Sequence, residues 1–168
     1  MTSTDFIPLT LYLALALGFS FLCSILEAVL LSVGPGYIQS MIDNGSKAGE
    51  RLQGQKNDLD KSLSAILTLN TIAHTMGAAG VGSEVSTLFD GKYLGWASAI
   101  LTLLVLVLSE VIPKTLGARY CNALAKPTSI LIHLLILGLY PVVWLSLIHI
   151  SAPTRPERIG GGGGWVEK

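Results

Sequence analysis

Four long stretches of this chain contain almost no charged residues, and they constrain its fold more than any other feature. A helix needs roughly 20 apolar residues to cross a bilayer, because the hydrocarbon core is about 30 Å thick. Only Glu27 interrupts the first stretch, and the other three carry no Asp, Glu, Lys or Arg. These lengths predict an all-α integral membrane protein. The stretches span residues 6–33, 62–83, 93–109 (continuing into Glu110) and 127–150.

Composition supports a membrane location and narrows the classes of partner. Charged residues make up 13% of the chain and the mean hydropathy is +0.60, whereas soluble domains carry roughly 25% charged residues. Eleven basic residues balance eleven acidic ones, so the chain lacks the excess of basic residues that would indicate nucleic-acid binding. The two cysteines, Cys23 and Cys121, lack metal-ligand spacing, so we expect neither a zinc site nor a disulfide framework.

The basic residues predict the orientation in the membrane. The loop 34–61 carries four Lys or Arg residues, whereas the short loop before the third stretch carries only Lys92, and basic residues accumulate on the cytoplasmic side. The N-terminus is therefore expected outside, and residues 114–126 inside after three crossings. The first ten residues hold Asp5 and no Lys or Arg, so we expect no cleaved signal peptide.

The fourth stretch, 127–150, needs a criterion other than hydropathy. A fourth crossing would export the basic residues of 151–168, which the charge rule disfavours. We therefore favour three transmembrane helices plus a belt-like juxtamembrane helix bent at Pro141, with a fourth crossing as the alternative. In the loop 34–61, two short helices are expected on either side of an Asn44-Gly45 turn.

Polar side chains in the first two membrane helices are the candidate functional residues. Ser20, Ser24 and Glu27 follow one another at intervals of four and three residues and share one helix face. In the second helix, Asn70 and His74 are one turn apart, with Thr71 beside them. Such groups are uncommon in lipid unless they pair across helices, and nearby small residues such as Gly77 allow close approach of a second helix.

The third helix adds a carboxylate next to a helix-breaking residue. Pro113 lacks the N–H that an α-helix would donate to the carbonyl of Ser109, which lies beside Glu110. A carboxylate, a free carbonyl and the Ser and Asn oxygens of two other helices form an oxygen donor set, which suits hard cations such as Mg²⁺, Ca²⁺ or Na⁺. Lys114 follows and is expected to extend toward the interface.

Each of these residues also has a structural interpretation. Serine hydroxyls can bond to carbonyls of their own helix, Asn70 and His74 can join helices without an ion, and Glu27 can be interfacial. A scaffold without transport activity is therefore one alternative. An intramembrane serine hydrolase using Ser24 and His74 is another, but it leaves Glu110 and Pro113 without a role.

Three sequence strings resemble the motifs of the CorC and cyclin M (CNNM) family, whose membrane module is also called DUF21 or hemolysin-like. The resemblance covers roughly residues 6–148, and the Glu-x-x-Pro-Lys string is its most specific part. The strings are SILEA at 24–28, LTLNT at 67–71 and EVIPKT at 110–115.

The resemblance implies a homodimeric transporter in the bacterial inner membrane, not an enzyme, that exports Mg²⁺ in exchange for Na⁺. It implies that Ser24, Asn70 and Glu110 bind the ion, with Ser20 as a less certain ligand. Many relatives carry a second asparagine where this chain has His74, so ion preference can differ.

The resemblance also bears on domain organisation. It implies a CNNM-type transmembrane domain at 1–150, and the glycine-rich residues 151–168 are interpreted as a disordered or foreign tail. The family usually continues into a pair of CBS domains that bind adenine nucleotide. The chain contains no such pair, so we expect no adenine nucleotide binding and interpret the sequence as a truncated form.

Overall fold

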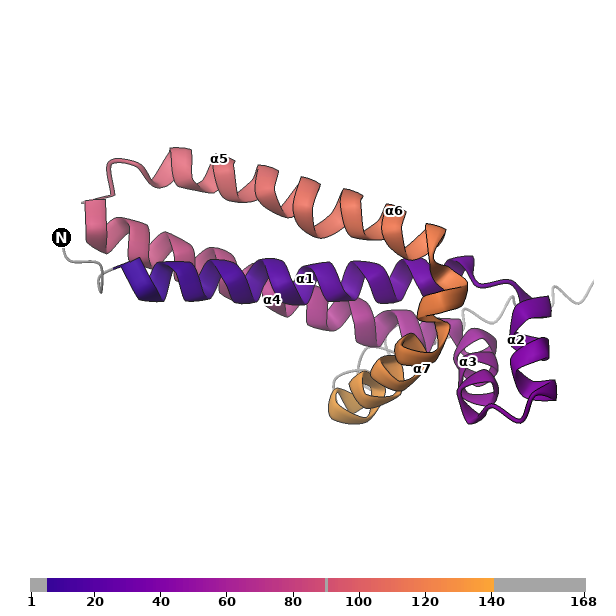
Figure 1. Cartoon of the computed structure of the whole chain (residues 1–168). Coiled ribbons are helices and arrows are strands. Elements are labelled where there is room, and N and C mark those ends of the chain that lie inside the picture. The colour runs from indigo at the N-terminus through magenta and orange to yellow at the C-terminus, as the bar shows by residue number, and fades with distance from the viewer. Residues whose placement is uncertain (1–5, 90, 141–168) are drawn as a thin grey trace, which may run out of the picture.

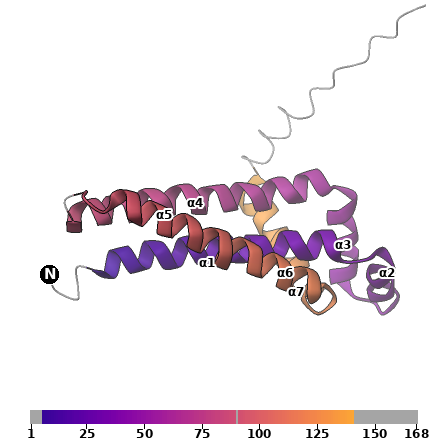
Figure 2. The same cartoon turned by 90° about the horizontal axis from the view of Figure 1, so that it is seen from above.

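In the computed structural model, which describes residues 6–89 and 91–140, the regular structure of the described chain is entirely helical. Three long rods run side by side: α1 (Ile7–Ser32), α4 (Leu59–Phe89), and a third that comprises α5 (Leu94–Leu104), a π-helix η2 (Val105–Val111) and α6 (Ile112–Arg119) (Figures 1 and 2). The short helices α2 (Pro35–Asp43) and α3 (Lys47–Asn57) lie at the end opposite the N-terminus, where α7 (Cys121–Gly138) also begins (Figure 1). The predicted all-α membrane architecture is confirmed.

Most of the expected helix bounds are confirmed. The first stretch forms α1, and the loop 34–61 holds α2 and α3 with the turn between them at Gly45, whose φ of 71° suits glycine. Within the described residues, three helices are long and apolar enough to cross a membrane: Ile7–Ser32, Leu94–Arg119 and Cys121–Gly138. The second expected crossing, 62–83, lies within α4, which is not one of these three because its polar and small residues lower its hydropathy. Since α4 runs alongside α1 (Figure 2), it extends over the same depth of the membrane as α1.

The segment after the third rod differs in detail from the prediction. Its helix begins at Cys121, six residues before Pro127, which is tolerated inside α7. This helix is apolar enough to span a membrane, yet it is inclined to α1 and α4 (Figure 1), as expected for a juxtamembrane helix. The bend predicted at Pro141 and the tail 151–168 lie outside the described residues.

The buried core lies at the end of the bundle where α2, α3 and α7 meet α1. Apolar residues from five helices form it, whereas only Ser109, Pro113 and Gly117 are buried between Leu94 and Arg119, so the third rod is left to face lipid or protein. The core residues include Leu26, Leu30, Ile38, Leu52, Ile66 and Ile132.

Two glycines allow the long rods to approach one another closely. A Cβ built at Gly77 of α4 would overlap the Cβ of Ala16 on α1. A Cβ at Gly117 of α6 would lie 2.9 Å from that of Ala28. Small residues at these crossings bring the polar groups of α1, α4 and the third rod together, which confirms the packing role predicted for Gly77.

Candidate cation site

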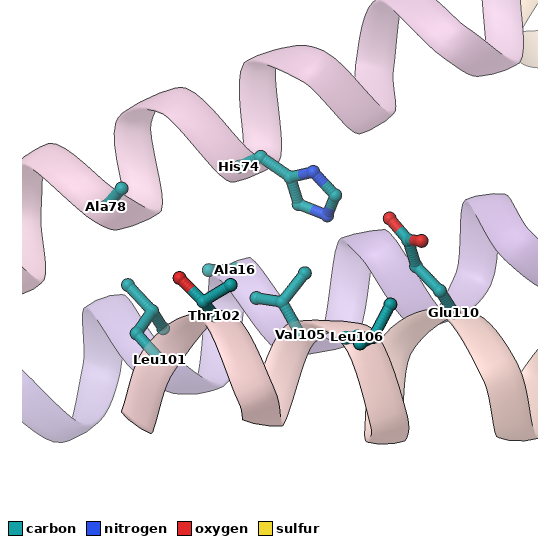
Figure 3. A pocket seen from close by; sticks show the side chains of 8 residues that line it. All are labelled: Ala16, His74, Ala78, Leu101, Thr102, Val105, Leu106 and Glu110. Atoms are coloured by element: carbon teal, nitrogen blue, oxygen red, sulfur yellow. The ribbon is translucent and has the colours of Figure 1, made fainter. Parts of the chain in front are cut away.

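A cavity lies between the three long rods, and its polar lining residues are His74 of α4, Thr102 of α5 and Glu110 of η2. The cavity has a volume of about 270 Å³, and Ala16, His74, Leu106 and Glu110 are among the residues that line it. Figure 3 shows the imidazole of His74 on α4 and the carboxylate of Glu110 on η2 facing the same space. Two side chains that are 36 positions apart in the sequence thus meet because α4 and the third rod form an antiparallel pair (Figure 1).

Two of the predicted ligands have oxygens that lack a hydrogen-bond partner. Ser24 on α1 is 1% exposed, and its Oγ is buried without a partner among the described residues. The Oδ1 of Asn70 on α4 is also buried without a hydrogen-bond partner among the described residues. A buried oxygen with no donor typically lowers the stability of a folded protein by about 1–3 kcal/mol. These two oxygens therefore either destabilise the fold or serve as ligands. Neither residue lines the cavity directly; each lies one helical turn from a residue of the polar cluster, Ser20 or His74.

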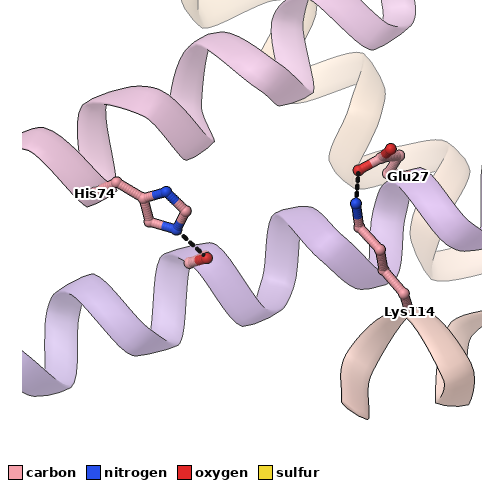
Figure 4. Close-up of polar contacts among 4 residues, drawn as sticks. Glu27, His74 and Lys114 are labelled. Atoms are coloured by element: carbon pink, nitrogen blue, oxygen red, sulfur yellow. Dashed lines mark hydrogen bonds and ion pairs between the residues drawn. The ribbon is translucent and has the colours of Figure 1, made fainter. Parts of the chain in front are cut away.

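Ser20 and His74 form a direct bond between α1 and α4. The Oγ of the fully buried Ser20 lies 2.6 Å from Nε2 of His74 (Figure 4). If the hydroxyl of Ser20 donates its hydrogen bond to Nε2, the serine oxygen keeps both lone pairs for another partner. The pairing also bears on the hydrolase alternative, because the imidazole is bonded to Ser20 and not to the proposed nucleophile Ser24.

The π-helix corrects one step of the sequence argument. The prediction assumed an α-helical ladder, in which Pro113 frees the carbonyl of Ser109. In η2 each hydrogen bond spans five residues, for example from the N–H of Ile112 to the carbonyl of Val107. With this spacing, the N–H that Pro113 lacks would have bonded to the carbonyl of Leu108, so that carbonyl, and not the one of Ser109, loses its donor. Ser109 acts through its side chain instead: its Oγ donates to the carbonyl of Leu17 at 3.2 Å and joins η2 to α1.

The remaining supporting residues lie outside the cavity. Thr71 is exposed and donates its hydroxyl to the carbonyl of Leu67 in its own helix, as serines and threonines often do. Glu27 and Lys114, each expected to be interfacial, form an ion pair of 3.2 Å between α1 and α6 (Figure 4). Sequence reasoning missed this pair, although two isolated opposite charges on otherwise apolar helices are a usable signal.

Breaking that ion pair is expected to loosen α6 from α1. Lys114→Gln leaves the carboxylate of Glu27, whose side chain is only 23% exposed, without its cation. We expect a loss of about 1 kcal/mol and a lower melting temperature in detergent. Exchanging the charges in the double variant Glu27→Lys with Lys114→Glu should recover part of the loss; equal destabilisation of Lys114→Gln and the double variant would show that the pair contributes nothing.

The donor set favours a hard cation. Among residues 6–89 and 91–140, no group of three or more His, Cys, Asp or Glu side chains could hold a metal ion. Glu110 is half-buried and makes no ion pair within this part of the chain. One carboxylate with hydroxyl and amide oxygens is the chemistry that Mg²⁺ and Ca²⁺ prefer over softer metals.

Comparisons with known proteins agree with the sequence motifs. The family described as the cyclin M transmembrane N-terminal domain matches residues 11–154. A UPF0053 protein of Synechocystis is 32% identical over 82% of this chain and 40% of its own length. The UPF0053 inner membrane protein YfjD of Escherichia coli is 28% identical over 77% of the chain and 29% of its own length. A chloroplastic DUF21 domain-containing protein of Arabidopsis thaliana is 24% identical over 82% of the chain and 19% of its length. The chain thus spans less than half the length of these relatives.

Proposed function

Because the chain belongs to the family of the cyclin M transmembrane N-terminal domain, we propose that it is the membrane part of a divalent-cation transporter whose cargo is Mg²⁺. The unpartnered buried oxygens of Ser24 and Asn70 are the observation that carries this proposal. They lack donors within the described helices, and a cation is the partner that an oxygen acceptor can take in place of a donor.

Each proposed ligand has a distinct role. Glu110 supplies the negative charge that offsets the loss of water from a divalent ion, and Ser24 and Asn70 supply neutral oxygens from α1 and α4. Ser20 contributes through the lone pairs that its bond to His74 leaves free. Because the donors come from separate rods, a shift of one rod against another changes how many oxygens reach the ion.

We further propose that the ion is exported with Na⁺ moving inward, by a homodimer in the bacterial inner membrane with its N-terminus outside. The basic loop 34–61 supports this orientation, and the inner membrane protein of E. coli that is similar to this chain supports the location. The exposed third rod supports assembly with a second copy, because it buries little against its own chain.

Thermal stability against MgCl₂ tests the proposal. Purified protein should gain stability saturably with Mg²⁺, since a ligand that binds only the folded state stabilises it by mass action. Glu110→Gln should lose most of this shift, because glutamine keeps the shape of the glutamate side chain but not its charge. NaCl and CaCl₂ at matched ionic strength serve as ion controls, and Glu84→Gln serves as the matched variant, because Glu84 does not line the cavity.

Two outcomes would contradict the proposal. An equal Mg²⁺ shift in the natural chain and in Glu110→Gln would place the ion elsewhere. No shift in either protein, together with altered assembly of Glu110→Gln, would favour the scaffold alternative, in which the polar groups only join helices.

A further inference from the structure

A second polar pocket lies away from the cation site, where α3 meets the beginning of α4 and the middle of α7. Its volume is about 250 Å³. Its polar lining comes from three segments of chain: the end of α3, the start of α4 and the face of α7 that carries His133. The polar residues are Arg51, Gln55, Asp58, Lys61, Ser62 and His133.

The charges around this pocket favour an anion. Arg51 and Lys61 each carry a positive charge and Asp58 a negative one, which leaves a surplus of one positive charge with His133 neutral. Neither cation is within ion-pair distance of a carboxylate in the described part of the chain. An anion in the pocket would be attracted by both side chains.

Gln55 adds a buried acceptor. This residue is 6% exposed; its Nε2 donates to the carbonyl of Ser129 at 2.8 Å, and its backbone carbonyl accepts from Ser62 Oγ at 3.0 Å. The first bond ties the Gln55 side chain to α7, and the second ties the backbone of α3 to α4. Its Oε1 is buried with no partner in residues 6–89 and 91–140, so it is available to a hydroxyl or ammonium donor.

The surface beside the pocket indicates a lipid. Ile130, Leu134 and Leu137 are exposed on α7, at intervals of four and three residues, on the same helix as His133. An exposed apolar stripe on a membrane helix can accommodate acyl chains. Basic pockets between membrane helices on the cytoplasmic side are typical headgroup sites, and this pocket lies by the basic loop 34–61.

We propose that this pocket binds the phosphodiester headgroup of a membrane lipid. Arg51 and Lys61 hold the phosphate, and the Oε1 of Gln55 accepts a hydrogen bond from a hydroxyl or ammonium of the headgroup. Phosphatidylglycerol and phosphatidylethanolamine carry such a donor, whereas phosphatidylcholine does not. Lipid in the pocket would fasten α7 to α3 and α4.

The test measures thermal stability of the full chain in detergent with EDTA, so that the result does not depend on the cation site. Phosphatidylglycerol should give a saturable rise in melting temperature, phosphatidylcholine a clearly smaller one, and inorganic phosphate at the same concentration none. Arg51→Gln with Lys61→Gln should lose the phosphatidylglycerol shift, and Arg51→Gln alone should reduce it. The control pair Lys92→Gln with Lys126→Gln removes equal charge away from the pocket and should keep the full shift.

Three results would overturn the proposal. The first is the absence of a phosphatidylglycerol shift in the natural chain, and the second is an equal loss in the pocket and control pairs, which would show only general attraction to anionic surfaces. The third is an equal shift with inorganic phosphate, which would make the pocket a site for free phosphate.

Discussion

Adding one methyl group at Gly77 is expected to destabilise the protein, whereas the same change at Gly18 should be neutral or stabilising. The Cβ of Gly77→Ala would overlap the Cβ of Ala16, so α1 and α4 must separate along their main contact. Overpacking of this kind costs about 1–3 kcal/mol. Around Gly18, in the middle of α1, nothing lies within 4 Å of an added Cβ, and alanine is favoured over glycine in a helix by up to about 1 kcal/mol.

A compensating variant makes this prediction specific. Ala16→Gly with Gly77→Ala moves the methyl group from α1 to α4 and should restore most of the melting temperature, measured by thermal unfolding in detergent. Separation of the two helices should also break the bond between Ser20 and His74 in the single variant. If Gly18→Ala and Gly77→Ala behave alike, or if the double variant is the least stable, the close contact of α1 and α4 is wrong.

Features of the fold that depend on local sequence could be predicted. The long run between residues 6 and 33, in which Glu27 is the one charged residue, defines α1 almost to its ends, and the glycine turn at 45 separates α2 from α3. These features follow from the length of an apolar run and from backbone preferences, which any window of sequence contains. The family resemblance rests on equally local strings, and the match over residues 11–154 confirms it.

Features that depend on the contact between helices could not be predicted. Small residues showed that α4 can pack closely, but the partner of His74, Ser20 on α1, follows only from the register of the two helices. The π-helix before Pro113 is likewise set by packing as well as sequence, because an extra residue per turn changes which side chains face α1. The ion pair of Glu27 and Lys114 needs α6 to lie against α1.

Removing the unpartnered hydroxyl is expected to have opposite effects with and without Mg²⁺. In EDTA, Ser24→Ala should be more stable than the natural chain by about 1 kcal/mol, because it removes a buried oxygen that no described residue satisfies. In saturating Mg²⁺ the order should reverse, since the variant lacks one ligand; a tenfold weaker site corresponds to about 1.4 kcal/mol. Asn70→Leu, which keeps a similar volume, should show the same crossing of the two stability curves.

This reversal separates a ligand from a structural hydroxyl. If Ser24 only bonded to its own helix, alanine would change stability by a similar small amount in both buffers, and the two curves would stay parallel. Ser98→Ala on the exposed α5 provides the matched control, because its side chain does not line the cavity shared by His74 and Glu110. A crossing at Ser24 and Asn70, with parallel curves at Ser98, would mean that the folded protein tolerates two orphaned oxygens because the cation satisfies them. The two oxygens would then destabilise the ion-free protein, and relief of this destabilisation on binding would contribute to the affinity for the ion.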